Sequence, residues 1–320
     1  MNRRQFVKSG ATATALLDLF PATLSSLARE QSPQGLEKRS LGKTGQMLSI
    51  LGFGGIVVKD ATPQEASRRV QDAIDHGVNY FDVAPSYGDA EEKLGPALQP
   101  FRREVFLACK TEQRRKRGTA AELDRSLRKL GTDHLDLYQL HAVTTAEEVE
   151  TILGPDGALR AFVEAKQAGK VRFLGFSAHS VEAALALMEG FAFDTILFPI
   201  NYVTWHAGNF GPQVLAKARE RGMGILALKA MAKGPWPVGA THSSPKCWYE
   251  PLSHPEDALL ALRFTLSHPV TAAIPPGDER LYRMALELGR KITPLQASEV
   301  EAIKRKALEG EPIFRYPRKA

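Results

Sequence analysis

The sequence predicts a single (β/α)8 barrel (a TIM barrel), on three observations: the length of the chain, a repeated run of apolar residues, and helix signals between the runs. The chain has 320 residues, and α/β barrels commonly use about 250 residues in one domain. Runs without regular polar alternation are typical of strands that are buried on both faces of a parallel sheet. Eight such runs recur beyond residue 40, at residues 49–55, 78–84, 104–110, 135–141, 171–177, 195–201, 224–230 and 270–275.

The segments between the runs carry signals for the start and the end of helices. Thr62 is expected to cap a helix, with Glu65 three residues later as its capping-box partner, and Gly77 is expected to end that helix. Thr119 repeats the start signal and Gly131 the end signal between the third and fourth runs. Strands and helices that alternate in this way are what a parallel barrel requires.

A Rossmann fold is the alternative α/β architecture, and the glycine pattern argues against it. The run Gly52–Gly55 fails the dinucleotide-binding fingerprint because Val57 stands where the third glycine belongs. The run Gly222–Ala227 satisfies GxGxxA, but it leads into a strand instead of leaving one to open a helix. The barrel therefore remains the predicted fold.

The composition is that of an ordinary globular protein. Hydrophobic residues make up 43% and charged residues 24% of the chain, and no run reaches the roughly 18 apolar residues that a membrane-spanning helix needs. The net charge is +6, of which the first 28 residues carry +2, so the remainder is too weakly basic to indicate a nucleic-acid partner. We interpret the basic cluster at residues 114–117 as a solvated loop. With two cysteines and no CxxC or HExxH spacing, neither a disulfide framework nor a metal site is expected.

Polar residues of different chemistry follow successive predicted strands. Asp82 lies near the end of the second run, Lys110 ends the third and His141 ends the fourth, while Tyr87 follows Asp82 in the adjoining loop. Because the carboxyl ends of barrel strands meet on one rim, we expect these four side chains to lie together.

The four residues have complementary chemistry. The phenol of Tyr87 has an ordinary pKa near 10, and the ammonium of Lys110 is expected to lower that pKa so that the phenol becomes a usable acid. Asp82 would hold the charge of Lys110, and His141 would donate a hydrogen bond to the oxygen that Tyr87 protonates. The set contains no electron donor, so a reduction would need a cofactor. Taken singly, each residue has a structural alternative; Asp82 could cap a helix, for example, and His141 could be a buried core histidine. Because the residues follow successive strands in order, together they favour a catalytic role.

At this point the sequence resembles the aldo-keto reductase superfamily. The segment 81–98 (FDVAPSYGDAEEKLGPAL) is similar to its aspartate–tyrosine signature, 105–110 (VFLACK) to its lysine strand and 135–141 (LDLYQLH) to its histidine strand. The resemblance runs from about Leu36 to about Gly289, and includes a small N-terminal β-hairpin that closes the bottom of the barrel.

The resemblance implies an NAD(P)H-dependent oxidoreductase that reduces an aldehyde or ketone to an alcohol, with a hydride from the nicotinamide and the proton from Tyr87. The alternative is a nicotinamide-binding regulatory or redox-sensing barrel whose turnover is incidental. We expect one barrel domain over residues 36–310 and a tail over 311–320. A small carbonyl compound is the expected partner, with no nucleic acid and no stable membrane insertion. The substrate, the direction of reaction and the oligomeric state are left open.

The resemblance also implies cofactor contacts after the later strands. Ser177 and Asn201 match positions that hold the nicotinamide amide, although Ala178 and Pro199 replace two other amide ligands. Lys229 stands where barrel enzymes often bind phosphate, with an outward-facing surface lysine as the alternative.

At the end of the eighth run and beyond it, residues 273–286 resemble the family's segment for the cofactor phosphate in shortened form. Pro276 and Gly277 replace its usual lysine and serine, and Gly277 is included among the cofactor-binding residues. Arg280 and Arg283 are candidates for a 2′-phosphate. NADP(H) is therefore favoured, and NAD(H) remains possible.

The segment 231–255 is long for a structureless loop and is expected to determine the choice of substrate. Trp236, Trp248 and Tyr249 would either wall an apolar pocket or pin the loop down. The basic cluster 114–117 follows the lysine strand, which suggests an anionic substrate as a hypothesis.

The first 28 residues resemble a twin-arginine export signal. Arg3 and Arg4 precede Phe6 and Lys8, a mildly apolar run follows, and cleavage is plausible after Ala28. The twin-arginine translocation machinery exports folded proteins, which suits a chain that takes up its cofactor inside the cell. The alternatives are an N-terminal helix or a disordered extension. A functional signal implies a periplasmic or exported protein, and otherwise a cytoplasmic one.

Overall fold

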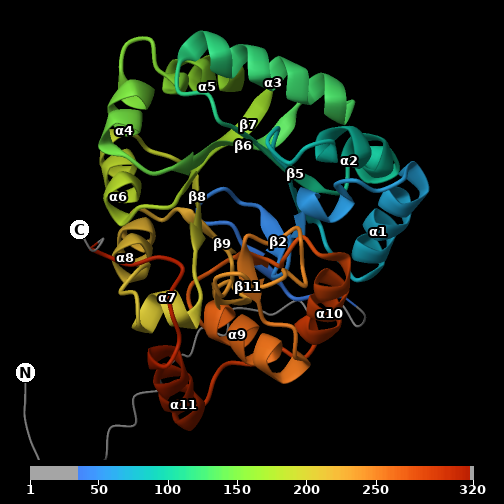
Figure 1. Cartoon of the computed structure of the whole chain (residues 1–320). Helices are drawn as coiled ribbons and strands as arrows, with labels where there is room; N and C mark the ends of the chain where they lie inside the picture. Colours follow the sequence, from blue (N-terminus) through green and yellow to red (C-terminus); the bar gives the residue numbers. More distant parts are fainter. Residues whose placement is uncertain (1–34, 318–320) are drawn as a thin grey trace, which may run out of the picture.

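The computed structural model describes residues 35–317, so the predicted export signal lies outside the described residues. Within them the chain forms the predicted (β/α)8 barrel, in which the helices form a ring around the strands (Figure 1). Every predicted run supplies a strand of one parallel sheet. In order along the sheet these are β12 (Ala272–Ile274), β9 (Gly224–Leu228), β8 (Thr195–Pro199), β7 (Val171–Ala178), β6 (Leu135–Val143), β5 (Phe106–Thr111), β4 (Tyr80–Asp82) and β3 (Phe53–Gly54).

The two ends of the sheet meet just before β3. Leu51 forms a parallel bridge with Ala273. The N–H of Gly52 donates to the Ala273 carbonyl at 2.9 Å, and the Ala273 N–H donates to the Ile50 carbonyl at 2.9 Å. These bonds satisfy backbone groups that an open edge would leave without partners, and they close the barrel.

The helices alternate with the strands in chain order. They are α1 (Pro63–Asp75), α2 (Ala90–Leu98), α3 (Lys116–Leu130), α4 (Ala146–Leu153), α5 (Ala158–Gln167), α6 (Val181–Gly190), α7 (Tyr202–His206), α8 (Pro212–Glu220), α9 (Pro255–Ser267), α10 (Glu279–Gly289) and α11 (Ala297–Leu308). Short 3-10 helices cover Gly55–Val58 and Gln99–Phe101. Among residues 35–317, no helix combines the length and the apolar character that a membrane crossing demands.

The predicted helix ends are confirmed at α1 and only in part at α3. Thr62 and Glu65 form the expected capping box at the start of α1. At α3 the prediction that Thr119 is the cap is wrong, because the helix begins at Lys116. The Thr119 hydroxyl instead donates to the Arg115 carbonyl one turn back, at 2.9 Å. Gly131 ends α3 with φ +62°, as expected.

The N-terminal hairpin of β1 (Lys38–Ser40) and β2 (Met47–Ser49) closes the bottom of the barrel. Leu41 and Leu48 are fully buried in a cluster with apolar side chains of the strand interior, among them Tyr80 and Leu226. Gly42 has φ +53°, and a Cβ there would overlap the backbone at Gly224. A glycine at this turn therefore lets the hairpin approach the barrel closely.

The long segment after β9 is not structureless. It carries an antiparallel hairpin of β10 (Ala232–Pro235) and β11 (Tyr249–Pro251). The chain end also packs back onto the barrel: Phe314 stacks on Phe210 with ring centroids 5.0 Å apart, and the Tyr316 N–H donates to the Gly208 carbonyl at 2.8 Å. Both segments therefore reach the mouth of the barrel, where the site lies.

Candidate active site

A cavity of about 210 Å³ opens at the carboxyl ends of the strands. Three of the four predicted catalytic residues, Asp82, Tyr87 and His141, line it, and Lys110 lies buried beside Asp82. Other lining residues come from β7, β9, the β10–β11 segment and the loop after β12, including Ser177, His179, Lys229, Trp248, Tyr249 and Gly277. The cavity therefore joins the predicted catalytic residues to several predicted cofactor contacts.

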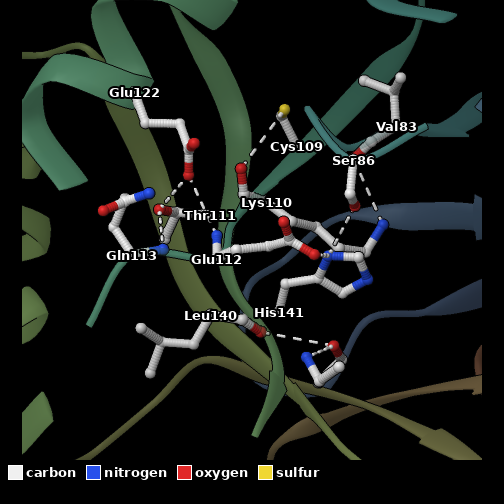
Figure 2. Close-up of polar contacts among 12 residues, drawn as sticks. Val83, Ser86, Cys109, Lys110, Thr111, Glu112, Gln113, Glu122, Leu140 and His141 are labelled. Carbon is white, nitrogen blue, oxygen red and sulfur yellow. Dashed lines mark hydrogen bonds and ion pairs between the residues drawn. The ribbon is translucent and has the colours of Figure 1, made fainter. Parts of the chain in front are cut away.

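Asp82 and Lys110 form a buried ion pair, with exposed fractions of 2% and 0%. Burial alone would lower the pKa of Lys110, but Asp82, together with Tyr87 and Cys109, outweighs this effect, and the net pKa lies above its usual value. The ammonium also donates to the Val83 carbonyl at 3.3 Å (Figure 2). Lys110 is therefore a permanent positive charge in the floor of the site.

Two residues that the sequence analysis missed hold Asp82. The Gln139 amide donates to Oδ2 of Asp82 at 2.9 Å, and the Tyr80 hydroxyl donates to the same oxygen at 3.1 Å. Their spacing could have identified them. Tyr80 and Asp82 are two residues apart, as are Gln139 and His141, and strand residues two apart share one face.

Tyr87 lies beside both Lys110 and His141. The Lys110 ammonium is 5.1 Å from the centroid of the phenol ring, and the rings of Tyr87 and His141 meet edge to face at 5.7 Å. Burial raises the pKa of Tyr87, and this effect is larger than the lowering by Lys110, so the net pKa is above its usual value. The prediction that Lys110 brings the pKa of Tyr87 below its ordinary value is therefore wrong. The phenol carries its proton at neutral pH, and Lys110 offsets only part of the cost of removing it.

A β-bulge directs His141 into the cavity. The pairing of β6 with β7 shifts register between Leu140 and Val143, and Ala142 has φ +52°. Bulges beside active sites commonly re-aim a side chain. The Ala142 N–H donates to the Ser177 hydroxyl at 2.7 Å, and Arg114 donates to the His141 carbonyl at 2.6 Å. These two bonds fix the peptide group between His141 and Ala142, directly after the histidine.

The His141 ring is a neutral hydrogen-bonding group. Burial lowers its pKa to about 3, with further lowering by Lys110, Lys229 and Arg114. Figure 2 shows the ring beside Ser86 and Glu112, with Nδ1 3.2 Å from the Ser86 hydroxyl oxygen and 3.6 Å from Oε1 of Glu112. When the Ser86 hydroxyl donates to Nδ1, the ring proton lies on Nε2 and can be donated to a substrate oxygen.

The predicted nicotinamide contacts differ in their positions. Ser177 is 1% exposed and lines the cavity, where its hydroxyl accepts from Ala142. Asn201 lies outside the cavity lining and caps α7, with its amide oxygen accepting from the Thr204 N–H at 2.9 Å. Its buried Nδ2 has no hydrogen-bond partner within residues 35–317. Asn201 thus keeps one donor that a bound group could use.

The segment after β12 forms a narrow cradle at the start of α10. Gly277 lines the cavity, and a Cβ there would overlap Ile56. Asp278 follows as the cap of α10, with its carboxylate accepting from the Leu281 N–H at 3.1 Å. A close backbone approach followed by a helix N-terminus fits a phosphate group. Arg280 is exposed in the first turn of α10, outside the cavity lining.

Lys229 is buried at the end of β9, so the alternative of an outward-facing surface lysine is wrong. It is 8% exposed, lines the cavity and has φ +64°. Its ammonium is 3.1 Å from Nε2 of His179, and 5.5 and 5.8 Å from the ring centroids of Trp248 and Phe314. Burial, and then the charge of Lys110, lower the pKa of Lys229 to about 7.

The aromatic residues of the β10–β11 segment divide between the two expected roles. Trp236 pins the segment, because its indole N–H donates to the Cys247 carbonyl at 2.9 Å. Trp248 and Tyr249 line the cavity. Lys246 donates to the Lys59 carbonyl at 2.6 Å, which ties this segment to the loop after β3 across the mouth.

The basic cluster 114–117 is not a loop throughout, because Lys116 and Arg117 begin α3. Arg114 pairs with Glu148 at 2.9 Å and Lys116 pairs with Glu164 at 2.6 Å. None of the four side chains is among the residues that line the cavity. In the described part of the chain, no group of three or more His, Cys, Asp or Glu side chains is arranged to hold a metal ion.

Comparison with known proteins gives a consistent family. The model of the aldo/keto reductase family matches residues 50–250. An aldo-keto reductase of Bacillus subtilis is 30% identical over 188 residues, which cover 52% of this chain and 54% of the relative. The L-galactose dehydrogenase of Arabidopsis thaliana is 26% identical over 216 residues, covering 62% and 66%. The matches thus span about half to two thirds of the length of these curated relatives.

Solved structures show the same fold. The holo form of an aldo-keto reductase from Bacillus halodurans superimposes with a TM-score of 0.68 at 23% identity, over 88% of this chain and 98% of that one. An aldo/keto reductase from Klebsiella pneumoniae, solved in complex with NADP and acetate, gives a TM-score of 0.66 at 20% identity, over 90% and 98%.

Proposed function

The chain belongs to the aldo/keto reductase family, and from this premise we propose that it is an NAD(P)H-dependent oxidoreductase that reduces an aldehyde or ketone carbonyl to an alcohol. One observation carries the proposal: a proton-bearing tyrosine, a buried lysine–aspartate pair and a neutral histidine converge on one cavity. This set can protonate a carbonyl oxygen and stabilise the charge that develops on it.

Each residue has a distinct role in that reaction. His141 donates a hydrogen bond that orients the substrate carbonyl, and Tyr87 delivers its proton to the carbonyl oxygen. Lys110 stabilises the phenolate that this transfer leaves, and Asp82 keeps Lys110 charged at the bottom of the site. Gln139 and the Tyr80 hydroxyl hold Asp82 in place without adding charge.

The bound nicotinamide supplies the hydride. Ser177 and Gly277 line the cavity and would contact it, and the N-terminus of α10 would receive a phosphate. Arg280 in the first turn of α10 supports NADP(H) over NAD(H), because a guanidinium can bind a 2′-phosphate. The NADP complex of the Klebsiella relative supports the same choice.

Rapid-mixing kinetics test the proposal. The full chain with bound NADPH is mixed with a panel of aldehydes, ketones and quinones, and cofactor oxidation is followed by absorbance. Tyr87→Phe removes the acid and should reduce the rate by about 10²- to 10⁴-fold. Tyr202→Phe is the matched control, since Tyr202 is buried away from the cavity against α9 and α11.

Two outcomes would contradict the proposal. A wild-type chain that binds NADPH but oxidises it with no member of the panel would favour the regulatory or redox-sensing alternative. Full activity in Tyr87→Phe would remove this tyrosine as the acid.

The N-terminal residues support a second part of the proposal, export of the folded protein by the twin-arginine machinery. The support is the Arg3–Arg4 pair followed by Phe6 and Lys8. Cell fractionation should find the wild type outside the cytoplasm, with its N-terminus trimmed after Ala28, whereas the Arg3→Lys/Arg4→Lys double variant stays inside. Equal distribution of the two chains would argue against export.

A further inference from the structure

Two buried lysines lie at the active site, Lys229 in the lining of the cavity and Lys110 behind Asp82, and they differ in their partners. Lys110 is paired with Asp82. Lys229 has no carboxylate within ion-pair distance among residues 35–317, and its polar neighbour is the imidazole of His179 at 3.1 Å. Asp82 is the one acidic residue among the side chains that line the cavity, and Lys110 already binds it. The cavity therefore holds an ammonium that no acidic group of the described chain neutralises.

The groups around Lys229 are uncharged, so none of them would repel an anion or neutralise the ammonium in its place. Burial lowers the pKa of His179 to about 2, so its ring is neutral and can accept a hydrogen bond from the ammonium. The ring stacks on Phe314 with centroids 5.1 Å apart, which fixes its orientation. Trp248 adds an apolar face that also lines the cavity. A buried cation held in this way lacks the partner that buried charges normally have.

We propose that Lys229 binds a carboxylate of the substrate, so that this chain reduces carbonyl compounds that carry an acid group. This inference rests on the proposed reductase function and names its substrate class. The carboxylate would supply the missing counter-charge, and the Trp248 ring would cover the carbon skeleton between the acid group and the reacting carbonyl.

A cofactor phosphate is the other anion that Lys229 could bind, and the position of the ammonium favours the substrate. Lys229 is close enough to His141 and Lys110 for its charge to contribute to lowering the pKa of His141 and for Lys110 to lower its own. Lys229 also lines the same cavity as Tyr87 and His141, where the reacting carbonyl would lie. The cradle at Gly277 and the N-terminus of α10 offer a separate place for phosphate at the end of β12.

The inference predicts a specific dependence on pH. Lys246, Cys247 and Tyr249 of the β10–β11 segment also line the cavity, but none of them shifts the pKa of Lys229. The ionisable groups whose charges interact with that of Lys229 are Lys110 on β5, His141 on β6 and His179 directly after β7. The pKa of Lys110 lies above its usual value, and those of the two histidines lie at about 3 and 2, so none of them titrates near neutrality. Lys229, with a pKa of about 7, loses its charge as pH rises through 7. For an acidic substrate kcat/KM should therefore fall above pH 7.

A pair of matched substrates tests this inference. 4-Carboxybenzaldehyde and 4-formylbenzamide have the same ring and aldehyde and differ mainly in charge. For the wild type, Lys229→Met and Lys233→Met, kcat/KM is measured for both substrates with saturating NADPH between pH 5.5 and 8.5. Lys233 is the control, since it is an exposed lysine of β10 paired with Glu250 at 2.7 Å. The Kd for NADPH is measured in parallel.

We expect Lys229→Met to lower the acid-to-amide ratio of kcat/KM by about 10- to 100-fold, the size of a lost hydrogen bond to a charged group. The ratio should stay unchanged in Lys233→Met, and the fall above pH 7 should be present only with the acid. Thermal unfolding verifies that each variant is folded.

Several results would overturn the inference. The ratio would be unchanged in Lys229→Met if the lysine did not contact the substrate. If the variant instead weakened NADPH and slowed both substrates by the same factor, the anion would be a cofactor phosphate. Titration of benzoate and benzamide into the complex with NADP⁺ adds a readout without turnover: the wild type should prefer benzoate and Lys229→Met should not. A wild type that binds benzoate in this way but reduces neither aldehyde would refute the reductase function and leave the carboxylate site intact.

Discussion

Replacing Lys110 by Met separates the structural role of the buried ion pair from its catalytic role. The substitution removes the ammonium and leaves Asp82 at 2% exposure without its cationic partner. Removing one partner of a buried pair usually costs about 3–5 kcal/mol of unfolding free energy. Asp82 keeps two donors, from Gln139 and Tyr80, so we expect the lower end, about 3 kcal/mol.

The opposite substitution should cost more. Asp82→Asn leaves the Lys110 ammonium without an anionic partner, although the Val83 carbonyl still accepts from it at 3.3 Å. We therefore expect about 4–5 kcal/mol for this variant. The double variant Lys110→Met/Asp82→Asn removes both charges. Its loss of unfolding free energy should therefore be smaller, by at least about 2 kcal/mol, than the sum of the losses in the two single variants. Catalysis should not follow stability: Lys110→Met and the double variant should lose about 10²- to 10⁴-fold in kcat, because Tyr87 is left without its cation. Asp82→Asn keeps Lys110 but removes the carboxylate that maintains its charge against burial, so kcat should fall in this variant too.

Urea unfolding at pH 7, followed by tryptophan fluorescence, measures the stabilities, and NADPH oxidation measures kcat. At pH 7 the titration of Lys110 does not affect the comparison. The pKa of Lys110 lies above its usual value in the folded state, so the stabilisation is complete at neutral pH and is lost only above about pH 10. Additive losses in the double variant would refute the coupling of the pair. Recovery of kcat in the double variant would refute the role of Lys110 in supporting Tyr87.

Three further predictions follow from single groups. Because burial raises the pKa of Tyr87, the rate of reduction of a neutral carbonyl should not change with pH between 5 and 9. The rate of oxidation of the alcohol, which needs the phenolate, should still be rising at pH 10, and a plateau of that rate near pH 8 would contradict this prediction. The pKa of His141 falls from an ordinary value near 6.5 to about 3 on folding, so its share of stability is present above pH 6.5 and is lost as pH falls toward 3. Urea unfolding at pH 4.5 and 7 should therefore show an acid loss that is smaller by roughly 2–3 kcal/mol in His141→Gln than in the wild type. Gly42→Ala should lower the thermal midpoint much more than Gly45→Ala, because both glycines have positive φ but only Gly42 would overlap the backbone; equal shifts would reject the close approach of the hairpin.

The fold could be predicted from the sequence because its signals are local. Each strand appears as an apolar run, and the Thr62 capping box needs only the residues of one turn. The same reasoning wrongly predicted a cap at Thr119, because Glu122, its expected capping partner, binds other groups. Glu122 accepts from the Thr111 hydroxyl at 2.6 Å and from the Glu112 N–H at 3.0 Å, which joins α3 to the end of β5. Glu122 therefore makes a tertiary contact instead of the local capping contact that the sequence pattern predicts.

The candidate site was predictable to the extent that its residues end strands. Asp82, Lys110 and His141 are of that kind, and Tyr87 follows at a loop distance. The environment of Lys229 had no comparable signal. Phe314 reaches the lysine from the far end of the chain, and nothing in the sequence of that tail indicates that it folds back over the barrel.

The two buried lysines show how one cavity can give the same side chain two kinds of behaviour. Asp82 makes the charge of Lys110 permanent, so Tyr87 always has a cation to stabilise its phenolate. Lys229 has no such partner, and its charge depends on what enters the cavity. A substrate carboxylate without a counter-ion would oppose the negative charge that develops on Tyr87 and on the reacting oxygen. By neutralising that carboxylate, Lys229 would preserve the field of Lys110, so its loss should reduce kcat for acidic substrates as well as raise their KM.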